Sequence, residues 1–362
     1  MKFNIFTYEG FKDTNIGDYI QSLAARQFLD KENIAYIHRD KLNDVNYESK
    51  AIMNGWFSHY PENWPPSDKI YPLFVSFHIN SAVYDTLLSD KSIEYFKKYE
   101  PIGCRDKTTA EKLQEKGVNA YFSSCLTTTL GYKYHSAKKS DTIYVVDAVH
   151  YIPESQRRLQ KYKFALLYLL NMKGINRFIR SIRADGIYNV NLSPKYYDRF
   201  CRIVRSYLVV KKLLTKEDLK HVQVLSQFYS ADEIPTNEAR FLKAEDFLRK
   251  YAEARLVITS RIHVALPCTG LETPVVFLQN MDDSIESTCR FKGLLDLLNV
   301  VKIQKNKILE SPFTLPFNIQ KNKILESPFT LPFNIESISN PNTFRSFAND
   351  LIKKCLDFIQ LK

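Results

Sequence analysis

The sequence predicts an α/β fold in two domains. The strongest indication is residues 255–278, where an apolar run rich in β-branched residues, a short helix and a second apolar run follow one another. Apolar runs alternate with helical stretches along most of the preceding chain. The 362 residues, 44% of them hydrophobic, suffice for two domains with a sizeable core. We expect the first domain at residues 1–140, the second at 141–300 and a tail at 301–362.

The first domain opens with a strand at residues 2–8, a tight turn and a helix at 19–29. Gly17 permits the turn, and Asp18 can cap the helix. The turn lacks the Gly-x-Gly-x-x-Gly pattern, which argues against a nicotinamide cofactor.

Polar residues follow two later strands of this domain. We expect strands at 34–38, 51–53, 71–78, 101–104 and 120–122, and helices at 92–99 and 107–116. His78 ends one of these strands, and Arg105 and Asp106 follow another. Because ligands of open α/β sheets bind outside the carboxyl ends of the strands, all three are candidates for ligand binding. The alternative is a surface pair of Arg105 and Asp106, which would contribute little to stability.

The second domain contains a comparable turn. We expect strands at 142–147, 222–225, 256–259 and 274–278, and helices at 244–253 and 264–271, with Ser260 as the cap of the last helix. Arg261 and His263 lie just before that helix. Backbone N–H groups near Ile262 and His263 favour an anion, which Arg261 can grip with two hydrogen bonds. His263 can also move a proton near neutral pH. The alternative is a surface arginine beside a histidine that caps a core helix.

The positive charge is concentrated in one block. Of a net charge of +11, residues 156–220 hold 16 Lys and Arg against 4 Asp and Glu, so the remaining chain is close to neutral. Such a block suits anionic lipid, a lipid-diphosphate substrate or nucleic acid. The block is predicted to be a helical insertion. The apolar run 164–170 within it is typical of a helix that lies on an anionic membrane. A helix packed on the protein with solvated basic residues explains it equally well.

The six cysteines are scattered without zinc-ligand spacing, which predicts reduced, mostly buried thiols and no metal. The chain has no apolar run of 18 residues and no signal-peptide pattern at its start. We therefore expect a cytoplasmic protein, with peripheral attachment to the inner membrane face through residues 156–220 as an extension of this reading.

The tail holds an internal repeat. Residues 303–318 recur without change as residues 319–334. Solenoids need at least three repeats, so a tandem duplication explains the pattern better. We expect one copy to keep its structural place and the other to form a surface loop. Residues 343–361 read as a terminal amphipathic helix that docks on the first domain.

Four motifs resemble the polysaccharide pyruvyl transferase family. They are Asn15-x-Gly17-Asp18 at the first turn, Arg105-Asp106 before a helix, the Thr-Leu segment Cys125–Leu130, and Ser260-Arg261-Ile262-His263 followed by Gly270 and Pro274. The resemblance extends from Asn15 to about Leu278 and is weakest in the basic block. The chain departs from the family pattern at Ile262, where leucine is usual, and in having only Gly10 upstream of the first turn.

The resemblance implies two Rossmann-like domains facing a cleft, as in GT-B glycosyltransferases. It also implies transfer of the enolpyruvyl unit of phosphoenolpyruvate to a sugar, giving a cyclic ketal and phosphate, with no cofactor beyond this donor substrate. Arg105 and Arg261 would hold the donor from opposite domains, and His263 would be the general acid. Asp18 is the first candidate for the base and Asp106 the second. Asn15, Ile262 and His78 complete the expected substrate contacts.

The expected acceptor is a sugar of a surface-polysaccharide precursor for exopolysaccharide or capsule, either a glycan or a lipid-linked saccharide. Two alternatives remain. One is a GT-B glycosyltransferase that uses a nucleotide sugar, and the other is a non-enzymatic polyanion- or membrane-binding protein that acts through the basic block. Because no RNA-binding motif accompanies the basic residues, we expect no nucleic-acid partner.

Overall fold

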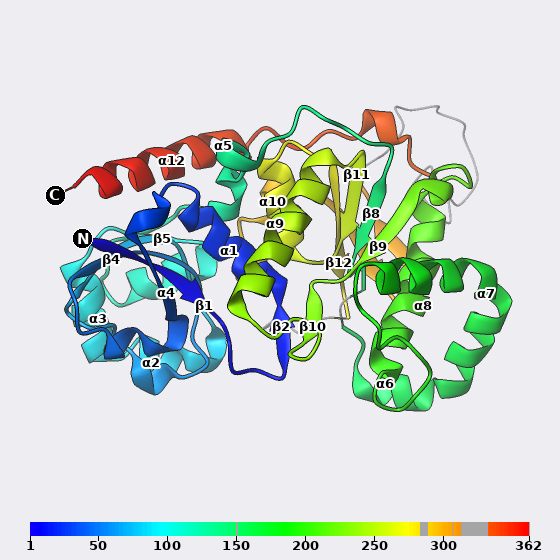
Figure 1. Ribbon diagram of the computed structural model, residues 1–362, viewed down its shortest axis with the longest axis horizontal. Coiled ribbons are helices and arrows are strands. Elements are labelled where there is room, and N and C mark those ends of the chain that lie inside the picture. Colours follow the sequence, from blue (N-terminus) through cyan, green and yellow to red (C-terminus); the bar gives the residue numbers. More distant parts are fainter. Residues whose placement is uncertain (150, 283–288, 306, 313–331, 362) are drawn as a thin grey trace.

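The computed structural model describes residues 1–149, 151–282, 289–305, 307–312 and 332–361. It contains two six-stranded sheets that lie side by side, each with helices packed against it (Figure 1). The predicted α/β class is therefore confirmed. The GT-B-like arrangement and the domain boundaries stay predictions.

The N-terminal sheet has the strand order β3-β1-β4-β5-β6-β7, and its neighbouring strands are parallel. Central strands of such sheets are covered on both faces, and β4 is accordingly buried along nearly its whole length. The strands are β1 (Lys2–Thr7), β3 (Ile34–His38), β4 (Ser49–Phe57), β5 (Ile70–Ile79), β6 (Ile102–Cys104) and β7 (Ala120–Phe122), and the helices are α1 (Ile16–Arg26), α2 (Tyr84–Leu87), α3 (Asp90–Lys98) and α4 (Lys107–Glu115).

The C-terminal sheet has the order β14-β13-β12-β11-β8-β9, and only β14 runs antiparallel to its neighbour among the described strands. Its strands are β8 (Ile143–Val146), β9 (Val222–Leu225), β11 (Leu256–Thr259), β12 (Val275–Asn280), β13 (Asn299–Gln304) and β14 (Lys307–Glu310). Its helices are α6 (Glu154–Leu159), α7 (Lys161–Ala184), α8 (Tyr197–Leu213), α9 (Asn237–Glu253) and α10 (Ile262–Gly270).

Two predicted helix caps are wrong. Asn15, not Asp18, caps α1, because its side chain accepts a hydrogen bond from the Gly17 N–H at 3.1 Å. Asp18 instead lies in the first turn of the helix. Ser260 donates its hydroxyl to the Asp147 carbonyl at 2.6 Å, which leaves Arg261 at the cap position of α10.

The contacts that join the two halves include three of different kinds. The strands β2 (Asp13–Asn15) and β10 (Phe228–Ser230) pair antiparallel between them. The 3-10 turn η5 (Leu126–Thr129), within the predicted Thr-Leu segment, packs against α10 so closely that a Cβ added to Gly270 would lie 2.4 Å from the Thr128 carbonyl oxygen. The third connection is the terminal helix α12 (Phe344–Gln360), which crosses back over the N-terminal sheet (Figure 1), where Phe358 stacks on Tyr71. This confirms the predicted docking.

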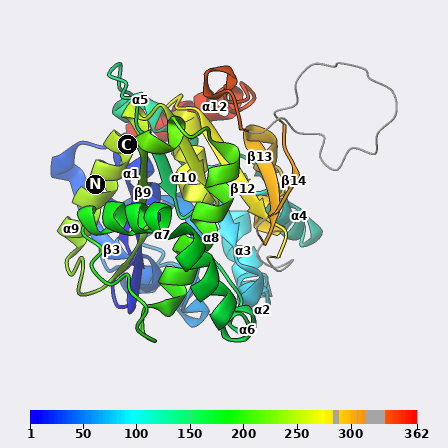
Figure 2. The ribbon, with the colours of Figure 1, turned by 90° about the vertical axis from the view of Figure 1, so that its right-hand side faces the viewer.

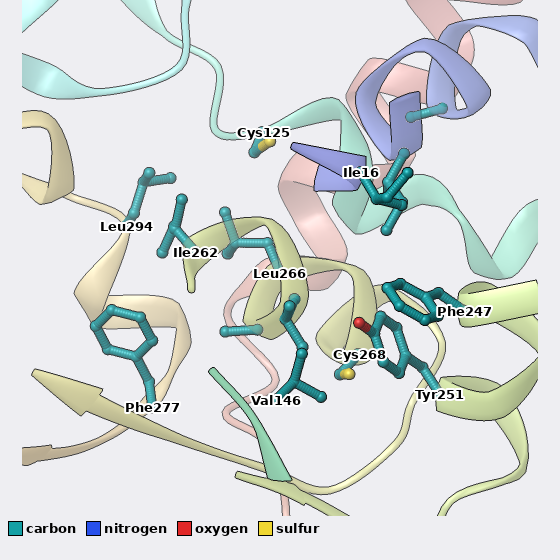
Figure 3. Packing of buried hydrophobic residues seen from close by; sticks show 14 of the residues in the cluster. Ile16, Cys125, Val146, Phe247, Tyr251, Ile262, Leu266, Cys268, Phe277 and Leu294 are labelled. Carbon is teal, nitrogen blue, oxygen red and sulfur yellow. The ribbon is translucent and has the colours of Figure 1, made fainter. Parts of the chain in front are cut away.

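Helix α10 lies in the core between the halves, and all nine of its residues are buried. Figure 3 shows its side chains Ile262, Leu266 and Cys268 among apolar residues from both halves of the chain. Because the helix is enclosed by packing, the residues at its start are held rigidly.

The basic block forms helices, as predicted. Seen from the side in Figure 2, α6, α7 and α8 lie in front of the C-terminal sheet, on the side of the molecule remote from the N-terminal sheet. Helix α7 has a kink at Asn171, where the backbone leaves the helical region.

Each copy of the tail repeat contributes residues to the described fold. The start of the first copy completes β13 and forms β14. The end of the second copy provides Phe333, which is buried and donates its N–H to the Leu213 carbonyl at 2.8 Å. The predicted surface loop falls on residues outside the described ranges.

The six cysteines, all within the described ranges, form no disulfide, and five of them are buried, as predicted. Among the described helices, none has the length and apolar character needed to cross a bilayer. Within the described ranges, no cluster of three His, Cys, Asp or Glu side chains is arranged to hold a metal ion.

Candidate active site

A cavity of about 180 Å³ lies where the two halves meet. It is lined by Asn15, Asp18, Trp56, His78, Asn80, Arg105, Ser260, Arg261, Ile262, His263 and Arg290. The lining includes every predicted site residue except Asp106, which lies behind His78. The carboxyl ends of β5 and β6 in one sheet and of β11 in the other therefore face the same space.

Arg105 reaches across from the N-terminal half to His263. Its backbone N–H donates to the Phe77 carbonyl at 2.8 Å, and its Nη1 lies 3.3 Å from His263 Nε2. The Nε–H group is buried and has no hydrogen-bond partner among the described residues. A buried hydrogen-bond donor without a partner costs free energy. This guanidinium could therefore donate a hydrogen bond to an anionic ligand.

Arg261 is held from both sides of the interface. Its Nη2 donates to Asn15 Oδ1 at 2.7 Å, and its guanidinium lies 4.1 Å from the centroid of the Phe228 ring. The start of α1 packs closely against the C-terminal half, because a Cβ on Gly17 would lie 2.9 Å from Gln227 Oε1 and 3.0 Å from His263 Cβ. Glycine at this position thus allows α1 to approach the arginine and the histidine.

His263 is surrounded by cations rather than by carboxylates. Its Nδ1 lies 3.3 Å from Gln21 Nε2, and its backbone carbonyl accepts a hydrogen bond from Gln227 at 3.2 Å. Burial, together with the charges of Arg105 and Arg261, holds the pKa of His263 well below its usual value of 6.5. The imidazole is therefore neutral near pH 7 unless a bound anion raises its pKa.

His78 has a carboxylate partner that His263 lacks. Its Nδ1 lies 2.6 Å from Asp106 Oδ2 and 3.1 Å from Thr109 Oγ1. Asp106 is fully buried, and it caps α4 by accepting the Thr109 N–H at 2.9 Å. Burial and the charge of Arg105 lower the pKa of His78 to about 4 in spite of Asp106. A neutral ring with Nδ1–H donated to the carboxylate presents Nε2 as a proton acceptor.

Asp18 is linked to His263 through one amide. The carboxylate accepts hydrogen bonds from Asn15 Nδ2 at 3.2 Å and from Gln21 Nε2 at 3.1 Å. Burial raises the pKa of Asp18, although the charges of Arg39 and Arg261 oppose this. A carboxylate with a raised pKa takes up a proton more readily than an ordinary aspartate, which suits it to act as a proton acceptor.

Sequence reasoning missed part of the cavity wall. Arg290 belongs to the short 3-10 turn η7 (Cys289–Phe291), where no strand or periodic pattern marks it. Asn80 follows β5, and Trp56 lies in β4 directly after Gly55. The guanidinium of Arg39 stacks 4.4 Å from the Trp56 ring. The Asn-Gly-Trp sequence after an apolar run is the signal that could have identified Trp56.

The comparisons with known proteins give a family match. The family model described as polysaccharide pyruvyl transferase matches residues 15–283, which is well over half of the chain. The match includes the cavity residues from Asn15 to His263 and ends before Arg290. No match was found among curated proteins.

Proposed function

The chain belongs to the polysaccharide pyruvyl transferase family, and from this premise we propose that it transfers pyruvate from phosphoenolpyruvate to a sugar as a cyclic ketal. The proposed acceptor is a sugar of a surface-polysaccharide precursor. One observation carries the proposal: Arg105 and Arg261, from opposite halves, line a single small cavity.

The cavity suits the proposed donor in charge and size. Phosphoenolpyruvate carries a phosphate and a carboxylate on three carbons, so it needs several cations close together. Arg105, Arg261 and Arg290 supply them, and the first N–H groups of α10 add partial positive charge. A volume of about 180 Å³ is small beside the roughly 300–1,000 Å³ typical of larger ligands. This favours phosphoenolpyruvate over a nucleotide sugar.

His263 becomes a proton donor once the donor substrate binds. A phosphate dianion beside the ring opposes the arginine charges that keep it neutral, and so raises its pKa. The charged imidazole then gives its proton to the methylene carbon of phosphoenolpyruvate. This makes a methyl group and leaves positive charge on the carbon that bears the phosphate.

His78 and Asp18 accept the protons of the acceptor. Nε2 of His78, oriented by Asp106, removes the proton of the first sugar hydroxyl as its oxygen bonds to the charged carbon. The bond to phosphate then breaks, the second hydroxyl closes the ring, and its proton passes to Asp18. Two O–H bonds, the C–O bond to phosphate and the π bond of the enol break, and two C–O bonds, one C–H bond and one O–H bond on the phosphate form. One hydroxyl proton replaces the proton given to the methyl group, and the other leaves with the phosphate.

Thermal unfolding with phosphoenolpyruvate, compared with a panel of nucleotide sugars, tests the proposal. A ligand at about 100 times its Kd stabilises the folded state by about 2.7 kcal/mol. We expect stabilisation by phosphoenolpyruvate that disappears in Arg261→Ala and in His263→Ala. The matched control is Arg249→Ala, an exposed arginine on α9 that should keep the shift. A shift with a nucleotide sugar alone would contradict pyruvyl transfer and indicate a glycosyl donor.

A further inference from the structure

The first half of α7 exposes a continuous apolar face. Tyr162, Leu166, Leu169 and Leu170 are 89%, 56%, 66% and 72% exposed. Their spacing of four, three and one residues places them on one side of the helix. The other side packs on the protein through buried Phe164. Scattered exposed leucines are ordinary, but a clustered set of this kind marks an interaction surface. We refer to these four residues as the α7 apolar face.

Lysines border this face on both sides. At about 100° per residue, Lys161 and Lys163 lie to either side of the stripe. Helix α7 also carries Lys173, Arg177, Arg180 and Arg183, and it contains neither Asp nor Glu. Within the described part of the chain, Lys161, Lys163 and Lys173 form no ion pair. The surface thus combines an apolar centre with cations whose charge is not neutralised.

The kink at Asn171 separates the first half of α7 from its second half. Lys211 Nζ donates to Asn171 Oδ1 at 2.7 Å, and Asn171 Nδ2 donates to the Leu167 carbonyl at 2.9 Å. Beyond the kink, Ile175, Phe178 and Ile182 are buried against the protein. The second half therefore anchors the helix, and the first half lies along the outer edge of the molecule (Figures 1 and 2).

We propose that the first half of α7 docks on the surface of an anionic lipid bilayer. The apolar face would enter the boundary between headgroups and acyl chains, and the bordering lysines would extend to the headgroup phosphates. Apolar burial and attraction to negative lipids then add to one another. The helix lies in the plane of the interface and does not cross the membrane.

Charge complementarity favours this partner over the alternatives. A twofold contact between copies of the chain would bring Lys161 and Lys163 of each copy together, and α7 offers no carboxylate to pair with them. Nucleic acid would satisfy the lysines but would leave the apolar face exposed. An anionic bilayer would pair with the lysines and also bury the apolar face. This inference holds whatever reaction the cavity performs.

Sedimentation of the full chain with lipid vesicles tests the proposal. One set of vesicles contains phosphatidylcholine alone, and the other contains phosphatidylcholine mixed with phosphatidylglycerol. We expect the protein to sediment with the anionic vesicles, less so as salt is raised, and to stay mostly in solution with the neutral ones. Absence of binding to anionic vesicles at low salt would overturn the proposal.

Variants locate the contact. Leu169→Gln combined with Leu170→Gln should weaken binding about tenfold or more, since each exposed leucine loses its burial in lipid. Leu242→Gln on α9 is the matched control, because Leu242 is also 66% exposed, and it should bind as the unaltered chain does. Lys161→Gln with Lys163→Gln should reduce the preference for anionic vesicles several-fold, while Lys353→Gln on α12 should not.

Two results would count against the assignment. The first is unchanged vesicle binding by the leucine variant, which would show that another surface carries it. The second is a dimer in sedimentation velocity that the leucine variant dissociates, which would identify a second copy as the partner. Because these side chains are exposed, unchanged unfolding temperatures should accompany every variant.

Discussion

Each half of the molecule places one histidine and at least one arginine in the cavity, Arg105 with His78 and Arg261 with His263, and the C-terminal half adds Arg290. The two histidines have different partners. On the N-terminal side, His78 is hydrogen-bonded to the buried carboxylate of Asp106 at 2.6 Å. On the C-terminal side, His263 has an amide and a guanidinium, each at 3.3 Å, in place of a carboxylate. The same side chain is thus placed in two electrostatic settings a short distance apart.

The difference shows how two histidines can divide the work of proton transfer. A carboxylate partner fixes the tautomer of His78 and leaves one ring nitrogen as a proton acceptor. The arginines around His263 make its pKa depend on whether an anion occupies the cavity. His78, with one ring nitrogen held as an acceptor, is therefore suited to act as a base, and His263 is suited to act as an acid once an anion has raised its pKa.

Loss of an arginine should have the largest effect. In Arg105→Gln, the donor phosphate loses a cation and His263 loses its neighbour. We expect kcat/KM for phosphoenolpyruvate to fall roughly a thousandfold, measured by phosphate release. Arg249→Gln on α9 serves as the control and should keep full activity. A fall below tenfold in Arg105→Gln would mean that the C-terminal pair alone holds the donor.

Replacing each histidine should separate the two roles. His78→Gln should lower kcat roughly a hundredfold and leave the Kd for phosphoenolpyruvate nearly unchanged, because the base acts on the acceptor. His263→Gln should lower kcat and also weaken the binding of phosphoenolpyruvate. Asp106→Asn should lower kcat like His78→Gln, but with an altered pH profile, since it acts by positioning His78. Identical kinetic behaviour of the two histidine variants would remove the distinction drawn between them.

Proton uptake offers a more direct comparison of the pairs. In the proposed mechanism the donor raises the pKa of His263, so its binding near pH 7 should be accompanied by a net uptake of protons. Calorimetric titrations in buffers of different ionisation enthalpy measure this uptake. We expect it to persist in His78→Gln and to be lost in His263→Gln. Uptake that vanishes only in His78→Gln would reverse the assignment.

Stability should fall as the pH is lowered. The pKa of His78 is about 4 when folded and about 6.5 when unfolded, so the unfolded chain binds more protons between these values. This stabilisation is present above pH 6.5 and is lost as the pH falls towards 4. Between pH 7 and pH 5, His78 should account for about 2 kcal/mol of lost unfolding free energy. Urea unfolding of His78→Gln should show a correspondingly smaller loss, and an equal loss would contradict the pKa.

The smallest effect is expected at a distance from both pairs. Any 16-residue deletion that removes one repeat unit from residues 303–334 yields the same chain. The remaining copy contains both the β14 sequence and a phenylalanine equivalent to Phe333, so we expect stability and activity to change little. Loss of folding would show that both copies are needed, and thermal unfolding measures this.

The residues at the ends of strands could be predicted from the sequence, but the order of the strands in the sheet could not. Placing His78 and Arg105 at carboxyl ends of strands required only local apolar runs. Their meeting depends on β5 and β6 being adjacent, with Phe77 opposite Cys104. Asp106 was therefore assigned as a base or ligand from its position, whereas the structure places it behind His78.

Other features depended on choices that local sequence does not decide. Asn15 and Asp18 are both good cap residues, and only the backbone geometry selects Asn15. Arg290 reaches the cavity from a three-residue turn without any periodic signal. The apolar run of α7 was compatible with a packed helix and with a membrane-facing one, and the exposure of Leu169 and Leu170 supports the second.

The central claim is that arginines from both halves bind one donor molecule. Isothermal titration of phosphoenolpyruvate into the unaltered chain, Arg105→Gln, Arg261→Gln and the double variant tests it most directly. We expect each single change to weaken binding about tenfold or more, since each removes a charge-assisted hydrogen bond, and the double change to abolish it. Wild-type affinity in either single variant would contradict the claim, because that arginine would then take no part in holding the donor.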